Sequence, residues 1–257
     1  MPPTTGPRHP LFLRLLRPIS PLSPEPFVEL TMDDEDDPEA SEVGIYLATR
    51  PSRQLEKWAS DIKRRHRLDK TFETDKGVSS LSLDPLRRGD LRAVGRWNSE
   101  LIGELGIPVR TVRGEQTACV SYSFIALAVL RATEEAVGFV SFTVDWRMDS
   151  HGDECADVEI EPDQAWIDPM YRRQQRGELM AFAIGQVVAH QFKDLDATTR
   201  WRPGSTVDVN VLILADIRSK SGEAFLKKCA EALDMEFTWW IDLQRMKLAS
   251  LDCRPYW

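Results

Sequence analysis

The chain has 257 residues, of which 42% are hydrophobic, and a formal net charge of -8. This length and composition allow one sizeable α/β domain with extensions, and the acidic balance argues against a nucleic-acid partner. No apolar run approaches the ~20 residues that a membrane-spanning helix needs. The four cysteines fit no disulfide framework. We therefore expect a cytoplasmic protein that contacts neither nucleic acid nor a membrane.

The N-terminal segment, residues 1–42, predicts a disordered tail. Prolines recur from Pro2 to Pro26, and an acidic run follows from Asp33 to Asp37. Such a composition buries too little apolar surface to offset the entropy lost on ordering. The remainder, residues 43–257, is predicted to form a single domain.

Hydrophobic periodicity predicts the order of the elements in that domain. Early helices are expected within 54–105, one at 54–66 and one at 90–105, each with an apolar face. Two strands, 119–131 and 137–146, then form a hairpin. Further along the chain we expect an extended segment at 158–167 bent at Pro162-Asp163, a helix at 177–192, a strand buried on both faces at 207–215, a helix at 223–233, and strands at 236–243 and 246–251. This order predicts an α/β fold with a mixed sheet.

The segment from Trp166 to Leu179 carries the clearest chemical signal. A strand ends at Ile167-Asp168-Pro169, a short basic loop follows, and a helix begins near Gly177. The open backbone amides at a helix N-terminus bind anions, and arginines in the loop add positive charge. Glycine allows a ligand to approach the backbone closely. The segment therefore suits a pyrophosphate.

These residues resemble the acyl-CoA-binding motif of the GNAT acetyltransferases. Ile167, Pro169, Tyr171 and Arg172 match the first half of the family pattern, and Gly177 matches its last glycine. Arg173 and Gln175 stand where the family has its two earlier glycines, so the loop carries bulkier side chains than is usual. The resemblance covers about residues 119–251 and implies a mixed, mainly antiparallel central sheet flanked by helices.

The resemblance also implies the cosubstrate and the residues that hold it. In the family, the strand before the loop splays from its neighbour, and the pantetheine arm of acetyl-CoA lies in that gap. The residues implied to bind acetyl-CoA are Trp166, Ile167, Asp168, Arg172, Arg173, Gln174, Gln175, Arg176, Gly177 and Glu178.

No metal site is expected. His151, Asp153 and Cys155 lie close together in one predicted loop, but no second cluster of metal-binding residues accompanies them.

Amine acetylation needs a base that removes a proton from the nucleophile. In the family this is often a glutamate on the strand before the loop, and Glu159 and Glu161 both lie there, on one face of the strand. Asp163 and Asp168 are weaker candidates. A cleft could raise the pKa of such a carboxylate towards neutrality.

The family's usual proton donor, a tyrosine on a later helix, is missing from residues 219–233, where Phe225 stands in a similar place. Two functions therefore remain open. The first is N-acetyl transfer from acetyl-CoA to a primary amine of a small molecule or protein, with transfer of a longer acyl chain as a variant of it. The second is a non-catalytic module of the same fold that binds CoA or a protein partner.

Overall fold

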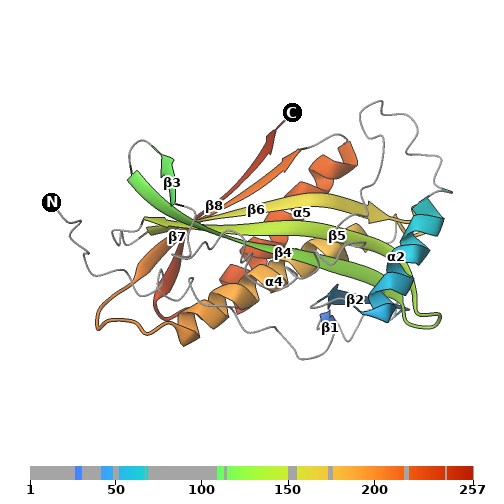
Figure 1. The fold of residues 1–257 in the computed structure, drawn as a ribbon, viewed down its shortest axis with the longest axis horizontal. Coiled ribbons are helices and arrows are strands. Elements are labelled where there is room, and N and C mark those ends of the chain that lie inside the picture. The colour runs from blue at the N-terminus through green and yellow to red at the C-terminus, as the bar shows by residue number, and fades with distance from the viewer. Residues whose placement is uncertain are drawn as a thin grey trace.

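A computed structural model of the chain describes residues 27–30, 42–48, 52–66, 68, 109–112, 115–149, 155–172, 176–216, 220–240 and 242–256. Strand follows strand from residue 109 to 167, and helices alternate with strands after that (Figure 1). In chain order the elements are β1 Phe27–Leu30, β2 Val43–Ala48, α2 Arg53–His66, β3 Val109–Val112, β4 Glu115–Leu130, β5 Glu135–Asp149, β6 Cys155–Ile167, the 3-10 helix η5 Pro169–Tyr171, α4 Arg176–Thr198, β7 Val207–Asp216, α5 Lys220–Met235, the π-helical turn η6 Glu236–Trp240, and β8 Met246–Tyr256.

One sheet runs through the molecule in the strand order β1-β2-β4-β5-β6-β7-β8, and the short β3 also pairs with β4. Every pair from β1 to β6 is antiparallel, whereas β6, β7 and β8 are parallel neighbours. The parallel pairs require crossover connections, which α4 and α5 supply. The predicted mixed, mainly antiparallel sheet flanked by helices is confirmed, and so is the hairpin that β4 and β5 form.

Alternating side chains divide the hydrophobic core between the two faces of the sheet. The larger cluster joins α4 and α5 to residues such as Phe142, Trp146 and Ile213. The smaller cluster joins Trp58 and Ile62 of α2 to Phe139 and neighbouring residues. Helix α2 therefore packs on the face opposite α4 and α5. None of the helices in the described ranges is both long and apolar enough to cross a membrane.

The region after α5 differs from the prediction. Residues 236–243 were expected to form a strand, but Glu236–Trp240 extend the helix as a π-helical turn. Phe237 packs there edge-on against Phe192 of α4, with ring centroids 4.7 Å apart. Packing against a helix thus overrides the β-forming tendency of an aromatic-rich segment.

Two further expectations need correction, and one cannot be compared. Phe27–Leu30, inside the expected disordered tail, form β1 and pair with β2. Strand β7 is not buried on both faces, because buried Val209 and Val211 alternate with exposed Asp208 and half-buried Asn210. The predicted helix at 90–105 lies outside the described residues.

Candidate functional site

The parallel strands β6 and β7 pair along only part of their length. Their register runs from Cys155↔Asp208 to Ile160↔Ile213, although β6 continues to Ile167 and β7 to Asp216. Figure 1 shows the two strands running together and then diverging towards their C-terminal ends. In the described ranges, no other strand pairs with this edge of β6. The sheet is therefore open between the C-terminal ends of two parallel neighbours, a position where α/β proteins often bind ligands.

A β-bulge in β6 lies close to the point where pairing with β7 ends. Ser141 of β5 faces Gln164, and the next residue, Phe142, faces Pro162, so Asp163 is the extra residue. A bulge bends the strand and changes the direction of its side chains. The bend predicted at Pro162-Asp163 is present, and it coincides with the divergence of the two strands.

The end of β6 directs only some backbone groups towards β7. The Asp168 amide donates to the Val137 carbonyl across the β5 ladder, at 2.8 Å. Because antiparallel hydrogen bonding alternates, Trp166 faces β5 as well, whereas the backbone groups of Ala165 and Ile167 face the β7 side. The Ile167 carbonyl there accepts a hydrogen bond from Arg172 Nε, at 2.8 Å. We call the gap between the unpaired C-terminal ends of β6 and β7 the opening. Of the three backbone positions predicted to hold pantetheine, only Ile167 is directed into it.

Asp168 holds the start of the loop in place. Asp168 is buried. Its Oδ1 accepts a hydrogen bond from the Met170 amide at 3.0 Å, and this bond caps η5. Its Oδ2 accepts from Arg65 of α2 at 2.9 Å. Both carboxylate oxygens of Asp168 are therefore engaged in holding this loop and α2 together.

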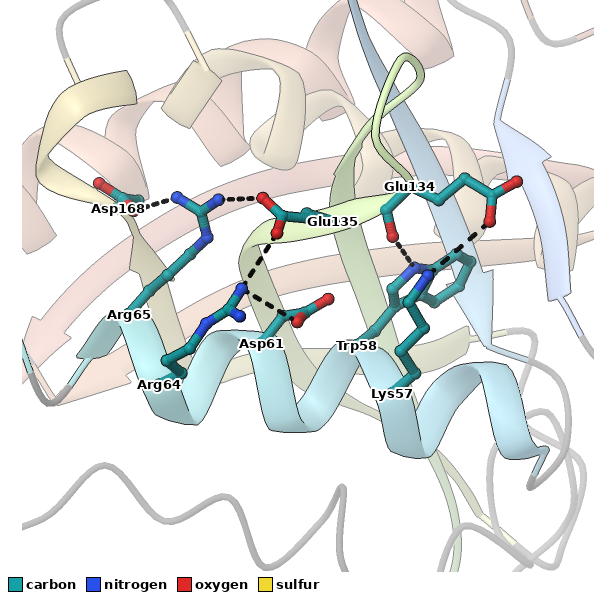
Figure 2. Close-up of polar contacts among 8 residues, drawn as sticks. All are labelled: Lys57, Trp58, Asp61, Arg64, Arg65, Glu134, Glu135 and Asp168. Carbon is teal, nitrogen blue, oxygen red and sulfur yellow. Dashed lines mark hydrogen bonds and ion pairs between the residues drawn. The ribbon is translucent and has the colours of Figure 1, made fainter.

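Arg65 connects that loop to a second strand. Figure 2 shows its guanidinium lying between Asp168 and Glu135, the first residue of β5, with the Glu135 contact at 2.5 Å. Arg64 also contacts Glu135 at 3.1 Å. The hydrogen bond from Arg65 lowers the pKa of Glu135 below its usual value. These ion pairs hold α2 against the start of β5 and the loop that follows β6.

The N-terminus of α4 lies just beyond this loop. A Cβ placed on Gly177 would have no heavy atom within 4 Å, so the space beside it is open. Glu178 instead pairs with Lys228 of α5 at 3.0 Å. Arg173, Gln174 and Gln175 lie outside the described residues, as does the side chain of Arg176. The contacts of these four side chains therefore stay predictions.

The predicted bases lie on the sheet face opposite α4. Glu159 and Glu161 stand directly across from Asp145 and Thr143 of β5. Glu159 Oε2 accepts a hydrogen bond from Arg147 at 2.6 Å. Asp163 also reaches this face, because Thr143 Oγ1 lies 3.5 Å from its Oδ2. We call Asp145, Glu159, Glu161 and Asp163 the carboxylate cluster.

Asp163 is the member of the cluster that is best poised to exchange a proton. Part of the residue is exposed, but protein atoms around its carboxylate displace water. This desolvation, together with the negative charges of Glu161 and Asp145, raises the pKa of Asp163 to about 6, against the smaller opposing effect of Thr143. A carboxyl group with this pKa is largely ionised near neutral pH and still accepts a proton readily.

Sequence reasoning ranked Asp163 below Glu159 and Glu161 and did not single out Arg65 or Asp145. The proline-aspartate pair at the predicted bend was the available signal for Asp163. Asp145 was also visible as a charged residue on a predicted strand otherwise rich in apolar side chains. His151 and Asp153 lie outside the described residues. The residues that the structure does describe include no group of three or more His, Cys, Asp or Glu arranged to bind a metal.

No protein-family model and no curated protein sequence matches this chain. Among solved structures, it is similar to one from Vibrio cholerae described as "a putative ribosomal-protein-serine acetyltransferase". The two share 15% sequence identity, and the alignment covers 79% of this chain and 83% of that chain with a TM-score of 0.36.

Proposed function

We propose that this protein is an N-acetyltransferase that transfers an acetyl group from acetyl-CoA to a primary amine. The observation that carries the proposal is the early end of β6–β7 pairing, beside a bulged strand with carboxylates on one face. That opening lies at the C-terminal ends of two parallel strands, each followed by a helix. It therefore brings an anion-binding helix N-terminus and proton-accepting groups to the same end of the sheet.

The residues near the α4 N-terminus suit the cosubstrate. Ile167 directs its backbone amide into the opening, where the amide carbonyls of a pantetheine arm are suitable acceptors. The open space beside Gly177 leaves room for a phosphate at the first turn of α4. Arg172 is an exposed basic side chain at the same end. These groups would hold acetyl-CoA, which supplies an acetyl group activated as a thioester.

The chain's own part in the chemistry is to accept a proton. A primary amine is mostly protonated near neutral pH and must lose a proton before it can act as a nucleophile. The neutral nitrogen then attacks the thioester carbonyl directly, the new C–N bond replaces the C–S bond, and CoA leaves as a thiolate that takes a proton from water. Asp163 and Glu161 lie on one face beside the opening, so we assign them the role of base. Glu159 is paired with Arg147, so we do not assign it this role.

A thiol-release assay tests the proposal. The protein is mixed with acetyl-CoA and a panel of primary amines, and free CoA is followed over many turnovers. We expect amine-dependent release that falls about 100-fold in Asp163→Asn, the scale of general-base catalysis. Asp208→Asn, an exposed change on the same sheet face, should retain the native rate.

If acetyl-CoA binds but no amine accelerates thiol release, the catalytic proposal is wrong. The same fold would then act as a CoA-binding module without turnover, which is the other function that the sequence left open.

A further inference from the structure

The carboxylate cluster contains more negative charge than a base requires. Residues 141–147 of β5 and 157–164 of β6 carry five carboxylates and one arginine, Arg147. All of these side chains belong to the face opposite α4, because the alternate residues between them are buried against α4 and α5. Arg147 contacts Glu159 at 2.6 Å and approaches Asp145 only to 4.0 Å. Along these two strand segments, five carboxylates therefore share one arginine.

Three buried oxygen atoms on this face indicate where a ligand would bind. Within the described part of the chain, Ser141 Oγ, Gln164 Oε1 and Asp145 Oδ1 are buried and have no hydrogen-bond partner. Ser141, only 3% exposed, faces Gln164 across the ladder at the bulge and lies two residues from Thr143, which contacts Asp163. Buried polar atoms without partners are rare in folded proteins and need an explanation.

The chemistry of these atoms limits the choice of ligand. A glutamine oxygen and carboxylate oxygens only accept hydrogen bonds, and a serine hydroxyl can accept as well. A ligand that satisfies the glutamine and carboxylate oxygens must donate hydrogen bonds, and a positive charge suits it to the neighbouring carboxylates. An ammonium group has three N–H donors and a positive charge.

The spacing along the two strands provides for two such groups. Glu161 faces Thr143, and Glu159 faces Asp145, so the cluster has two levels. Residues two apart on a strand lie about 7 Å apart, which is about the length of a four-carbon diamine. The level of Glu161 and Asp163 is at the bulge, where β6 leaves β7. The level of Asp145 and Glu159 lies two residues farther from the C-terminal end of β6.

We propose that the acceptor is a dicationic amine whose reacting nitrogen lies at Asp163 and Glu161 and whose second ammonium binds at Asp145. This inference rests on the proposed function, because it names the substrate class of the same site. Asp145 acts in it as a specificity-determining residue, since its unpartnered Oδ1 accepts from the nitrogen that does not react.

Calorimetric titration with 1,4-diaminobutane and 1-aminobutane tests the proposal, because these two ligands differ by one charged nitrogen on the same carbon chain. Each titration is run with free protein and with protein saturated with CoA. We expect the diamine to bind about tenfold more tightly than the monoamine, the factor expected for one added ion pair in a partly buried site. Asp145→Asn should reduce diamine affinity to the monoamine level. Asp208→Asn should preserve the tenfold difference.

Equal affinities for the two amines, no binding of either amine, or an unchanged preference in Asp145→Asn would each overturn the dicationic assignment. The failure of this inference is distinguishable from failure of the proposed function. Amine-dependent thiol release without a preference for diamines leaves the acetyltransferase proposal intact. Diamine binding without any CoA binding leaves the cation site intact and removes the acetyltransferase proposal.

Discussion

Asp163 combines a bulge position, partial desolvation and negative neighbours in one residue. Its ordinary pKa is near 4, and its surroundings raise it to about 6. Between these values the folded protein binds the proton that the unfolded chain has already released. The contribution of Asp163 to stability therefore falls as pH rises from 4 to 6 and is constant above that range.

Urea unfolding at several pH values measures this contribution. We expect the free energy of unfolding of the native protein, relative to Asp163→Asn, to decrease between pH 4 and 6. The reason is that, as the pH rises, the unmutated protein must ionise the Asp163 carboxyl group in desolvated, negatively charged surroundings, whereas Asp163→Asn has no carboxyl group there. A difference that stays constant over this range would contradict the desolvation of Asp163. Asp208→Asn, at an exposed position, is the control substitution.

At the scale of elements, helix α4 does more than cover the sheet. The Asp196 carboxylate accepts hydrogen bonds from the backbone amides of Gln244, Arg245 and Met246, at 2.7, 3.0 and 2.9 Å. These residues lead into β8, so one buried side chain fixes where the last strand begins. Strand β8 is in turn the only described partner of β7 beyond Ile213.

Asp196→Ala should lower the free energy of unfolding by about 3 kcal/mol, because three backbone donors lose their acceptor. Asp196→Asn, which retains one acceptor oxygen, should lie between the native protein and the alanine variant. Denaturant unfolding measures all three, with Asp234→Ala as the control at an exposed position of α5. A loss of less than 1 kcal/mol in Asp196→Ala would show that these hydrogen bonds do not hold β8.

The sequence predicted most elements because their periodicity is strong and local. The amphipathic α2, the apolar β4 and β5, and the helix after Gly177 all have patterns that a short window shows. The segment after α5 was missed because Phe237 packs on Phe192, a contact between residues far apart in the chain. Tertiary contacts of this kind leave no periodic trace in a sequence.

The same reasoning explains which parts of the site were predictable. Glu159 and Glu161 were visible because alternation puts both on one face. The pairing of Glu159 with Arg147 depends on the register between β5 and β6, and sequence alone does not give that register. Arg65 lies 103 residues from Asp168 in the chain, so its role depends wholly on how α2 packs.

At the scale of the whole molecule, an antiparallel half of the sheet meets a parallel half at β6. The ladder with β5 runs along most of β6, whereas the ladder with β7 ends at Ile160. The loop that leaves β6 is tied back to α2 through Arg65 and Asp168 (Figure 2). The proposed site thus lies where the fold leaves a strand edge open and where ion pairs hold the β6 side of that opening against α2.

The central claim is that acetyl-CoA binds at this opening, against the first turn of α4. Calorimetric titration with acetyl-CoA tests it in the native protein, in Gly177→Glu and in Ala197→Glu. The first variant puts a carboxylate into the open space beside Gly177, and the second puts the same charge at the exposed, opposite end of α4. We predict that the native protein and Ala197→Glu bind with equal affinity and that Gly177→Glu loses binding. Absence of binding by the native protein, or equal binding by both variants, would contradict the claim.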